Sequence, residues 1–256
     1  MNKFETFLQL HHNKELLLIG NVWDVTGAMI FDQNGFKAIA TSSRAIALSF
    51  GYEDGEQMPF DLLLDTTKRI INNINVPLSV DLETGYSRNT DGIIHNIEKL
   101  YDLGVVGFNI EDSILEEKGK LQDINSFAKT VNTIVNHLQQ KNMKMFVNAR
   151  TDTFLHKFPN ALQETVTRVK AFENAGASGV FVPFANNKND ISTILNATKL
   201  PLNILSVPAL PTIDELNNVG VKRISMGSSM YEFFRNSLNK KLQTLLAKKS
   251  FEDLYN

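Results

Sequence analysis

The sequence of 256 residues predicts a (β/α)₈ barrel, the TIM-barrel fold, and three observations support this prediction. Short apolar runs alternate with amphipathic segments from one end of the chain to the other. There are eight such runs, and eight parallel strands close a barrel of this kind. The length and the 43% content of hydrophobic residues suffice for one large core. We expect a single barrel domain over residues 1–256, with residues 229–256 as a C-terminal helical segment.

The eight predicted strands are apolar and rich in β-branched residues. They begin at Leu16, Ala38, Val76, Val106, Lys144, Gly179, Leu200 and Arg223. Amphipathic stretches such as IIHNIEKLYDLG and SFAKTVNTIVNHLQQ lie between them and predict helices, which Gly104 and Gly176 would terminate in two cases. Each helix returns the chain to the same end of the sheet, so neighbouring strands are parallel. A doubly wound open sheet is the alternative, but no GxGxxG follows the first strand.

The last predicted helix, which starts at Ser229, is longer than one barrel helix needs. Its Leu and Phe residues must be buried either against the same barrel or against a neighbouring subunit. This segment therefore raises the expectation of a homo-oligomer.

Composition excludes several classes of function. The formal net charge is −2 and no cluster of Lys or Arg forms a basic stripe, so we expect no nucleic-acid partner. The chain has no cysteine, which removes disulfides, thiolate metal sites and cysteine-based catalysis. No apolar run has the length of a signal peptide or of a membrane span. We expect a cytoplasmic protein without a membrane partner.

Polar residues gather where the predicted strands end, and in a barrel the chemistry takes place at that end. The residues at these positions are Asp24, Thr41, Ser42, Ser43, Arg44, Asp81, Glu83, Glu111, Asp112, Arg150, Asp152, Gly227 and Ser228.

Three of these carboxylates predict a metal site. Asp81 and Glu83 are two residues apart and point to the same face of their strand, and Glu111 ends the next strand. Carboxylates that converge repel one another unless a cation or protons neutralise them, and hard oxygen ligands suit Mg²⁺. The alternative for each carboxylate is a helix cap or a pair with a lysine.

Arg150 and two turns predict binding of an anion. The planar guanidinium of Arg150 can bind a carboxylate or phosphate, or it can form an internal salt bridge with Asp152 or Glu111. The Thr-Ser-Ser-Arg turn offers hydroxyl and N–H groups at a predicted helix start, where ordinary N-capping is the alternative. Gly227 and Ser228, after the eighth strand, could form the phosphate site that many barrels have there, although this signal is weak by itself. A phosphate-binding barrel without the metal site is therefore a further alternative. His156 is the one histidine near the strand ends and is a candidate general acid or base.

Taken together, these strand ends resemble the isocitrate lyase/phosphoenolpyruvate mutase superfamily. The resemblance runs from NVWDVTGAMIF to KRISMGSSMY, and its specific motifs are VDLETGY, NIED and NARTD, in that order. It implies a TIM barrel that binds Mg²⁺, with Mn²⁺ as the alternative ion, and a 2-oxo carboxylate. It also implies reactions through an enolate of pyruvate and a last helix that is swapped between the subunits of a homodimer or homotetramer.

By matched position, the resemblance assigns a role to each site residue. Asp81 would be the nearest metal ligand, with Asp54, Glu83 and Glu111 around it, partly through water. Ser42, Ser43 and Arg44 would hold the substrate's carboxylate together with Arg150. Arg150, Glu111 and Asp54 would be the catalytic residues, with Arg150 and Mg²⁺ stabilising the enolate charge as it develops.

The sequence departs from the superfamily at several positions, and these differences limit the reactions that we expect. Lyases carry a Lys-(Lys/Arg)-Cys-Gly-His loop after the fourth strand, whereas residues 111–123, which we name the gate segment, read EDSILEEKGKLQD. The Pro-Lys and Asn-Ser elements of the mutases and phosphonopyruvate hydrolases are also missing, which leaves Lys118 and Lys120 as the gate cations. Lyases place a Glu after the sixth strand, where this chain has Pro183 and Phe184.

These departures predict a C–C lyase or decarboxylase that acts on a small 2-oxo or 2-hydroxy carboxylate. It would not be a cysteine-dependent isocitrate lyase. P–C chemistry on phosphonopyruvate-type substrates and a non-catalytic barrel that binds an oxo acid are the alternatives.

Overall fold

The computed structural model describes residues 2–255 and confirms the predicted barrel. Its eight strands are β1 (Leu17–Val22), β2 (Ile39–Thr41), β3 (Leu78–Asp81), β4 (Gly107–Glu111), β5 (Phe146–Arg150), β6 (Gly179–Val182), β7 (Leu202–Leu205) and β8 (Arg223–Ser225). Every neighbouring pair is parallel, and β8 pairs with β1 to close the sheet. The open-sheet alternative is therefore wrong.

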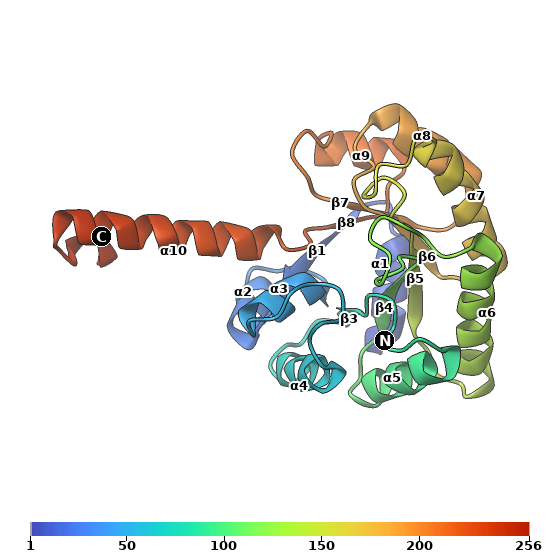
Figure 1. Ribbon diagram of the computed structural model, residues 1–256, viewed down its shortest axis with the longest axis horizontal. Coiled ribbons are helices and arrows are strands. Elements are labelled where there is room, and N and C mark those ends of the chain that lie inside the picture. The colour runs from blue at the N-terminus through green and yellow to red at the C-terminus, as the bar shows by residue number, and fades with distance from the viewer. Residues whose placement is uncertain (1, 256) are drawn as a thin grey trace.

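Helices surround this barrel (Figure 1). They are α1 (Lys3–His12), α2 (Val25–Gln33), α3 (Ser43–Ser49), α4 (Phe60–Ile71), α5 (Thr90–Asp102), α6 (Ile124–Gln140), α7 (Ala161–Asn174), α8 (Lys188–Ala197), α9 (Ile213–Val219) and α10 (Ser229–Lys248), followed by the short 3₁₀ helix η1 (Glu252–Leu254). Gly104 and Gly176 have φ of 90° and 89° directly after the ends of α5 and α7, as their predicted role in ending helices requires.

Alternation along the strands gives the sheet two chemically different faces. Val80 and Ile110 belong to the large apolar core that the surrounding helices cover. Their neighbours Asp81 and Asn109 point to the other face, inside the barrel, where Asn109 Nδ2 donates to Asp81 Oδ1 at 3.1 Å. Asn148 of β5 continues this line by donating to Asn109 Oδ1 at 2.8 Å. A chain of side-chain amides inside the barrel therefore leads up to Asp81.

Helix α1 covers the end of the barrel at which the strands begin. Phe7 is fully buried and contacts Phe146 at a ring-centroid distance of 5.6 Å. His11 stacks on the same ring at 4.2 Å and donates from Nδ1 to the carbonyl oxygen of Phe7. Burial, together with the charge of Arg223, lowers the pKa of His11 to about 3, so this histidine is a neutral core residue. The sequence patterns placed no separate helix over this end.

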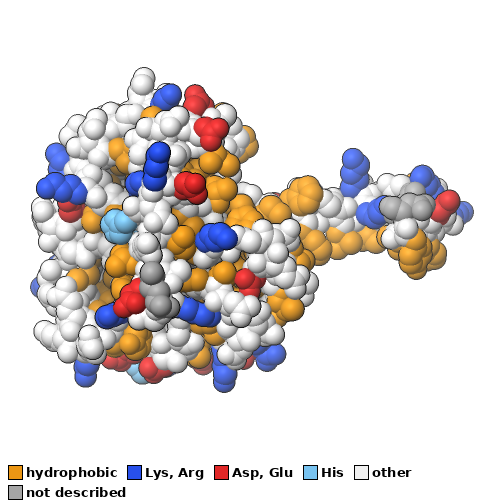
Figure 2. All heavy atoms as spheres, turned by 180° about the vertical axis from the view of Figure 1, so that it is seen from behind, with side chains coloured by type: hydrophobic (Ala, Val, Ile, Leu, Met, Phe, Trp, Pro, Cys, Tyr) orange, Lys and Arg blue, Asp and Glu red, His pale blue; other side chains and the backbone are white. Residues whose placement is uncertain are grey.

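Helix α10 projects away from the barrel (Figure 1). Its first turns touch the barrel through Tyr231 and Phe234, which pack against Trp23 at ring-centroid distances of 5.1 and 5.9 Å. Further along, large apolar side chains are exposed on the projecting part, and Figure 2 shows them gathered along one side of it. They include Phe233, Leu238, Leu242 and Leu246. Within residues 2–255, no helix combines the length and apolarity needed to cross a membrane.

Candidate active site

The predicted site residues lie at the carboxyl ends of three neighbouring strands. Asp81 is the last residue of β3, Glu111 the last of β4 and Arg150 the last of β5. Glu111 and Arg150 are direct partners in the β4–β5 register, and Asp81 is opposite Asn109 in the β3–β4 register. This arrangement puts two carboxylates and a guanidinium at one edge of the barrel mouth.

Asp81 is held by hydrogen bonds to residues of three elements. Ser43 Oγ donates to its Oδ2 at 2.7 Å, and Asn109 Nδ2 donates to its Oδ1. The Asp81 backbone N–H donates to Thr41 Oγ1 at 2.9 Å. These contacts fix the carboxylate in one orientation, with lone pairs left for a further ligand.

Glu83 lies just beyond the end of β3 in a strained loop. Its side chain accepts from the Tyr86 hydroxyl at 3.0 Å and from the Glu56 backbone N–H at 2.9 Å. Glu56, Glu83 and Tyr86 all have positive φ, between 52° and 57°. Three such residues close together indicate a loop held in place by its surroundings, a feature that clusters at functional sites.

Burial, together with the nearby charges of Asp54, Asp81 and Glu56, raises the pKa of Glu83 to about 8. Burial also raises the pKa of the Tyr86 phenol, assisted by Glu83. A carboxyl group in these surroundings takes up a proton near neutral pH unless a cation is present.

Arg150 is shared between two carboxylates. Its Nη1 lies 2.7 Å from Glu111 Oε2, and its Nε and Nη2 donate to the two oxygens of Asp152 at 2.7 and 3.0 Å. Burial raises the pKa of Glu111 well above its usual range, against the opposing effect of Arg150. The internal salt bridges anticipated as the alternative role of Arg150 are therefore present. They also fix its guanidinium over the ring of Phe181, at 5.5 Å from the ring centroid.

The turn after β2 is partly engaged with its own helix. Ser42 Oγ accepts from the Ala45 N–H at 3.3 Å and so caps α3, which is the ordinary capping alternative. Ser43 instead faces Asp81. Arg44 lies 3.6 Å from Asp54, and both side chains are half-exposed. Desolvation and the Asp81 charge raise the pKa of Asp54.

The carboxylates do not form a ready-made metal cage. Within the part of the chain that the structure describes, no group of three His, Asp or Glu side chains is arranged so that it could hold an ion. The donor set nevertheless fits Mg²⁺, because all its atoms are hard oxygens. The charge of Asp81 raises the pKa values of Asp54 and Glu83, the charge of Asp54 also raises that of Glu83, and a bound cation would relieve this repulsion. If Asp81 alone contacted the ion and Asp54, Glu83 and Glu111 bound it through water, the side chains would not need to surround the ion directly.

The phosphate site expected at Gly227 and Ser228 after β8 has one of its backbone donors already in use. The backbone N–H groups of Met226 and Gly227 both donate to Asn21 Oδ1, at 2.7 and 3.2 Å. Since these donors are already used inside the barrel, the structure gives no support to an anion held by Gly227 and Ser228.

The gate segment folds back on itself beside the mouth. Ser113 and Leu121 form an antiparallel bridge, and the Gln122 N–H donates to the carbonyl oxygen of Asp112 at 2.7 Å. Lys120 pairs with Glu117 inside the segment.

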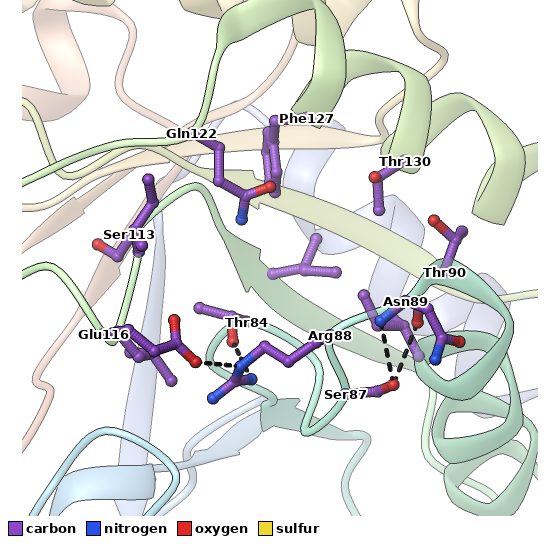
Figure 3. A pocket seen from close by; sticks show the side chains of 14 residues that line it. Thr84, Ser87, Arg88, Asn89, Thr90, Ser113, Glu116, Gln122, Phe127 and Thr130 are labelled. Atoms are coloured by element: carbon purple, nitrogen blue, oxygen red, sulfur yellow. Dashed lines mark hydrogen bonds and ion pairs between the residues drawn. The ribbon is translucent and has the colours of Figure 1, made fainter.

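Arg88 joins the gate segment to the loop between α3 and α4. Its Nη1 lies 2.7 Å from Glu56. Its Nε lies 2.5 Å from Glu116, a contact that Figure 3 shows. Glu56 also accepts from the backbone N–H groups of Thr84 and Tyr86. Behind these contacts is a cavity of about 190 Å³ between the gate segment, α5 and α6. It lies beside the acidic cluster, and neither Asp81 nor Arg150 lines it.

Several contributors were not predicted from the sequence. Glu56 lies in an irregular stretch that no pattern singles out. Arg168 of α7 is buried and pairs with Asp112 at 2.8 Å, although helical spacing alone gave it no role. Ser113 follows NIED directly, and its place in the chain could have singled it out. Phe184, which stands where lyases have a Glu, is exposed with φ of 64°.

Comparison with known proteins identifies the family. The model of the phosphoenolpyruvate phosphomutase family matches residues 7–246. The chain belongs to this family. The resemblance to the isocitrate lyase/phosphoenolpyruvate mutase superfamily, predicted from the strand ends, is thereby confirmed.

Individual relatives cover most of the chain. The uncharacterized protein Rv1998c of Mycobacterium tuberculosis is 34% identical over 88% of this chain and 83% of its own length. An oxaloacetate decarboxylase of Paraburkholderia xenovorans is 25% identical over 92% of this chain and 79% of its own length. A crystal structure of a proposed phosphonomutase from Burkholderia cenocepacia J2315 has a TM-score of 0.89 and 33% identity, covering 94% of this chain and 99% of that one. Relatives in this superfamily are lyases and phosphomutases.

Proposed function

We propose that this family member is a Mg²⁺-dependent lyase or decarboxylase that cleaves a C–C bond in a small 2-oxo or 2-hydroxy carboxylate. The reaction would pass through an enolate of pyruvate. The observation that carries the proposal is the junction of Asp81, Glu111 and Arg150 at three adjacent strand ends, with Ser43 bound to Asp81. The 25% identity to an oxaloacetate decarboxylase supports the same class of reaction.

Each residue has a role that its position allows. Asp81 would hold the metal ion directly, with Asp54, Glu83 and Glu111 around it, partly through water. A bound Mg²⁺ would supply a positive charge that polarises the substrate's carbonyl and carboxylate oxygens. Ser42, Ser43 and Arg44 would bind a substrate carboxylate at the start of α3.

Arg150 would bind the substrate and stabilise negative charge on it. Its ion pairs with Asp152 and Glu111 hold the guanidinium in place before substrate arrives, so little reorganisation is needed when charge develops. Lysine could not reproduce this role, because one ammonium group cannot bind Asp152 with two parallel donors and also reach Glu111.

P–C chemistry is the second candidate, favoured by the 33% identity to the proposed phosphonomutase. It ranks below C–C cleavage because the gate segment lacks the Pro-Lys and Asn-Ser elements of the mutases and hydrolases. A non-catalytic barrel that binds an oxo acid is the third reading.

A Mg²⁺-dependent screen that detects pyruvate separates these readings. The panel contains oxaloacetate, malate-type and citramalate-type acids and phosphonopyruvate. Turnover of a carbon acid that is lost with EDTA and in Arg150→Ala supports the proposal, and turnover of phosphonopyruvate alone supports the second candidate. If no acid in the panel is turned over, and oxalate and Mg²⁺ together do not stabilise the protein, the non-catalytic barrel is supported.

We also propose that α10 is exchanged between the subunits of a homodimer or homotetramer. The exposed side chains of Phe233, Leu238 and Leu246 lie on a helix that makes few contacts with its own barrel. A second copy of the chain offers the same helix and the same barrel edge, which is the self-complementary geometry of a two-fold dimer.

A further inference from the structure

Ser113, Asp152 and His156 form a hydrogen-bonded cluster at the ends of β4 and β5. Ser113 Oγ donates to Asp152 Oδ2 at 2.7 Å and lies 3.2 Å from His156 Nε2. A serine hydroxyl has one proton, and an ionised carboxylate can only accept. Because that proton is directed at Asp152, the second contact is a hydrogen bond from His156 Nε2–H to Ser113 Oγ. The order of donors therefore runs from His156 through Ser113 to Asp152.

This cluster is joined directly to Arg150. Asp152 Oδ2 accepts from Ser113 and also from Arg150 Nη2 at 3.0 Å, so the serine hydroxyl and the guanidinium share one oxygen atom. Ser113 and Asp152 are buried, whereas His156 is partly exposed. The histidine thus connects solvent to a hydroxyl that lies beside the proposed substrate-binding arginine.

The proposed reaction leaves a chemical requirement to which none of the roles assigned above corresponds. Cleavage or decarboxylation leaves an enolate, and its carbon must gain a proton to become the methyl or methylene group of the product. The gate segment has no cysteine, its Lys118 is exposed to solvent, and its Lys120 is paired with Glu117. Arg150 cannot serve as the acid, because a guanidinium is not deprotonated in proteins.

We propose that His156 and Ser113 form the proton relay that protonates this enolate carbon. The inference rests on the proposed function. The Ser113 hydroxyl first turns from Asp152 toward the enolate carbon. As the new C–H bond forms, the Ser113 O–H bond breaks, and the protonated imidazole of His156 passes its Nε2 proton to the serine oxygen. The histidine becomes neutral and regains a proton from water on its exposed side, so charge and protons balance. Asp152 is a positioning residue that orients both the hydroxyl and Arg150.

The test uses the full chain with Mg²⁺ and pyruvate in D₂O, with exchange of the pyruvate methyl protons followed by proton NMR. Exchange requires only enolate formation and protonation, so it isolates the relay from bond cleavage. We expect Ser113→Ala and His156→Gln each to slow exchange by about 10²-fold or more, the usual contribution of a positioned acid or base. In a single-turnover measurement, release of CO₂ from oxaloacetate should fall much less, because it precedes protonation. Ser113→Thr, which keeps a hydroxyl, should restore exchange.

Two controls separate the relay from a structural role. His137→Gln removes a histidine that pairs with Glu98, between α6 and α5 and away from the mouth, and it should leave exchange unchanged. Stabilisation of each variant by oxalate with Mg²⁺ reports an intact site. Wild-type exchange rates in both variants overturn the relay and leave the proposed function standing. Loss of exchange in parallel with loss of oxalate binding also overturns it, in favour of positioning alone. A wild-type protein that neither exchanges pyruvate nor turns over any acid overturns the relay and the proposed function together.

Discussion

Arg168 Nη1 lies 2.8 Å from Asp112 Oδ2, and both side chains are almost completely buried. The pair joins α7 to the first residue after β4. Burial raises the pKa of Asp112 to about 6, while Arg168 opposes this shift. Removing one member leaves the other as an unpaired buried charge.

We therefore expect Arg168→Leu to lower the free energy of unfolding by about 3–5 kcal/mol, as breaking a buried pair does. Urea denaturation at pH 7.5 measures it. The matched control is Arg69→Leu, which breaks an exposed pair with Asp65 on α4 and should cost at most about 1 kcal/mol. Adding Asp112→Asn to Arg168→Leu should recover part of the loss, and a double variant as unstable as the single one would contradict this account.

Glu83 should make stability depend on pH in metal-free buffer. Its pKa is about 8 in the folded protein and near 4.5 in the unfolded chain, so the folded state binds this proton more tightly. Proton binding by Glu83 therefore contributes favourably to the free energy of unfolding. This contribution is fully present below about pH 4.5 and is lost as pH rises through about 8.

Glu83→Gln keeps the side chain neutral at every pH. With EDTA present, we expect it to match the wild type in melting temperature near pH 4.5 and to exceed it at pH 9, by about 2–4 °C for each kcal/mol relieved. Substituting the exposed Glu53 by Gln should produce no such divergence. Parallel curves for wild type and Glu83→Gln across this range would show that the carboxyl does not carry the effect.

Arg88 should restrain the gate segment. Arg88→Gln removes its ion pairs with Glu56 and Glu116, which come from two different loops. We expect faster amide hydrogen exchange in residues 113–121, by a factor of about ten, and unchanged exchange in β5. Because Glu116 is exposed, Glu116→Gln should produce a smaller increase in the same peptides. If neither variant alters exchange there, the self-bonded gate segment holds its position without Arg88.

The exposed side of α10 should control assembly. Leu238→Asp and Leu242→Asp together place two charges on the apolar stripe, and we expect the molar mass in light scattering to fall to that of one chain, 28.8 kDa. Lys240→Asp lies on the same helix between them and serves as the control for added charge, with assembly retained. A wild type that is itself monomeric at micromolar concentration would contradict the proposed exchange of this helix.

The barrel could be predicted from the sequence because each strand is an apolar run that the helical segments separate. Strand ends such as Asp81, Glu111 and Arg150 could also be placed, since period and register put them at one edge. The partners of these side chains could not be predicted in this way. Glu83 bonds to Tyr86 and to the backbone of Glu56 because the loop turns through positive φ, a conformation that neither residue type indicates.

Long-range partners also lay beyond the reach of sequence patterns. Helix α1 resembles a polar tail, because its buried residues Phe7 and His11 are few and their contacts come from β5 and β8. The cluster of Ser113 with His156 joins residues 43 positions apart, and only the adjacency of β4 and β5 brings them together.

The position of α1 has a consequence for how the chain reaches its native state during synthesis. Helix α1 is synthesised before β5 and β8, yet it packs on Phe146 of β5 and lies near Arg223 of β8, and β1 completes its pairing only with β8. Helix α1 therefore stays without its native surroundings until these strands have been made. Nascent chains should keep this amphipathic helix accessible to chaperones until then, and ring closure and capping should follow together once residue 225 has emerged.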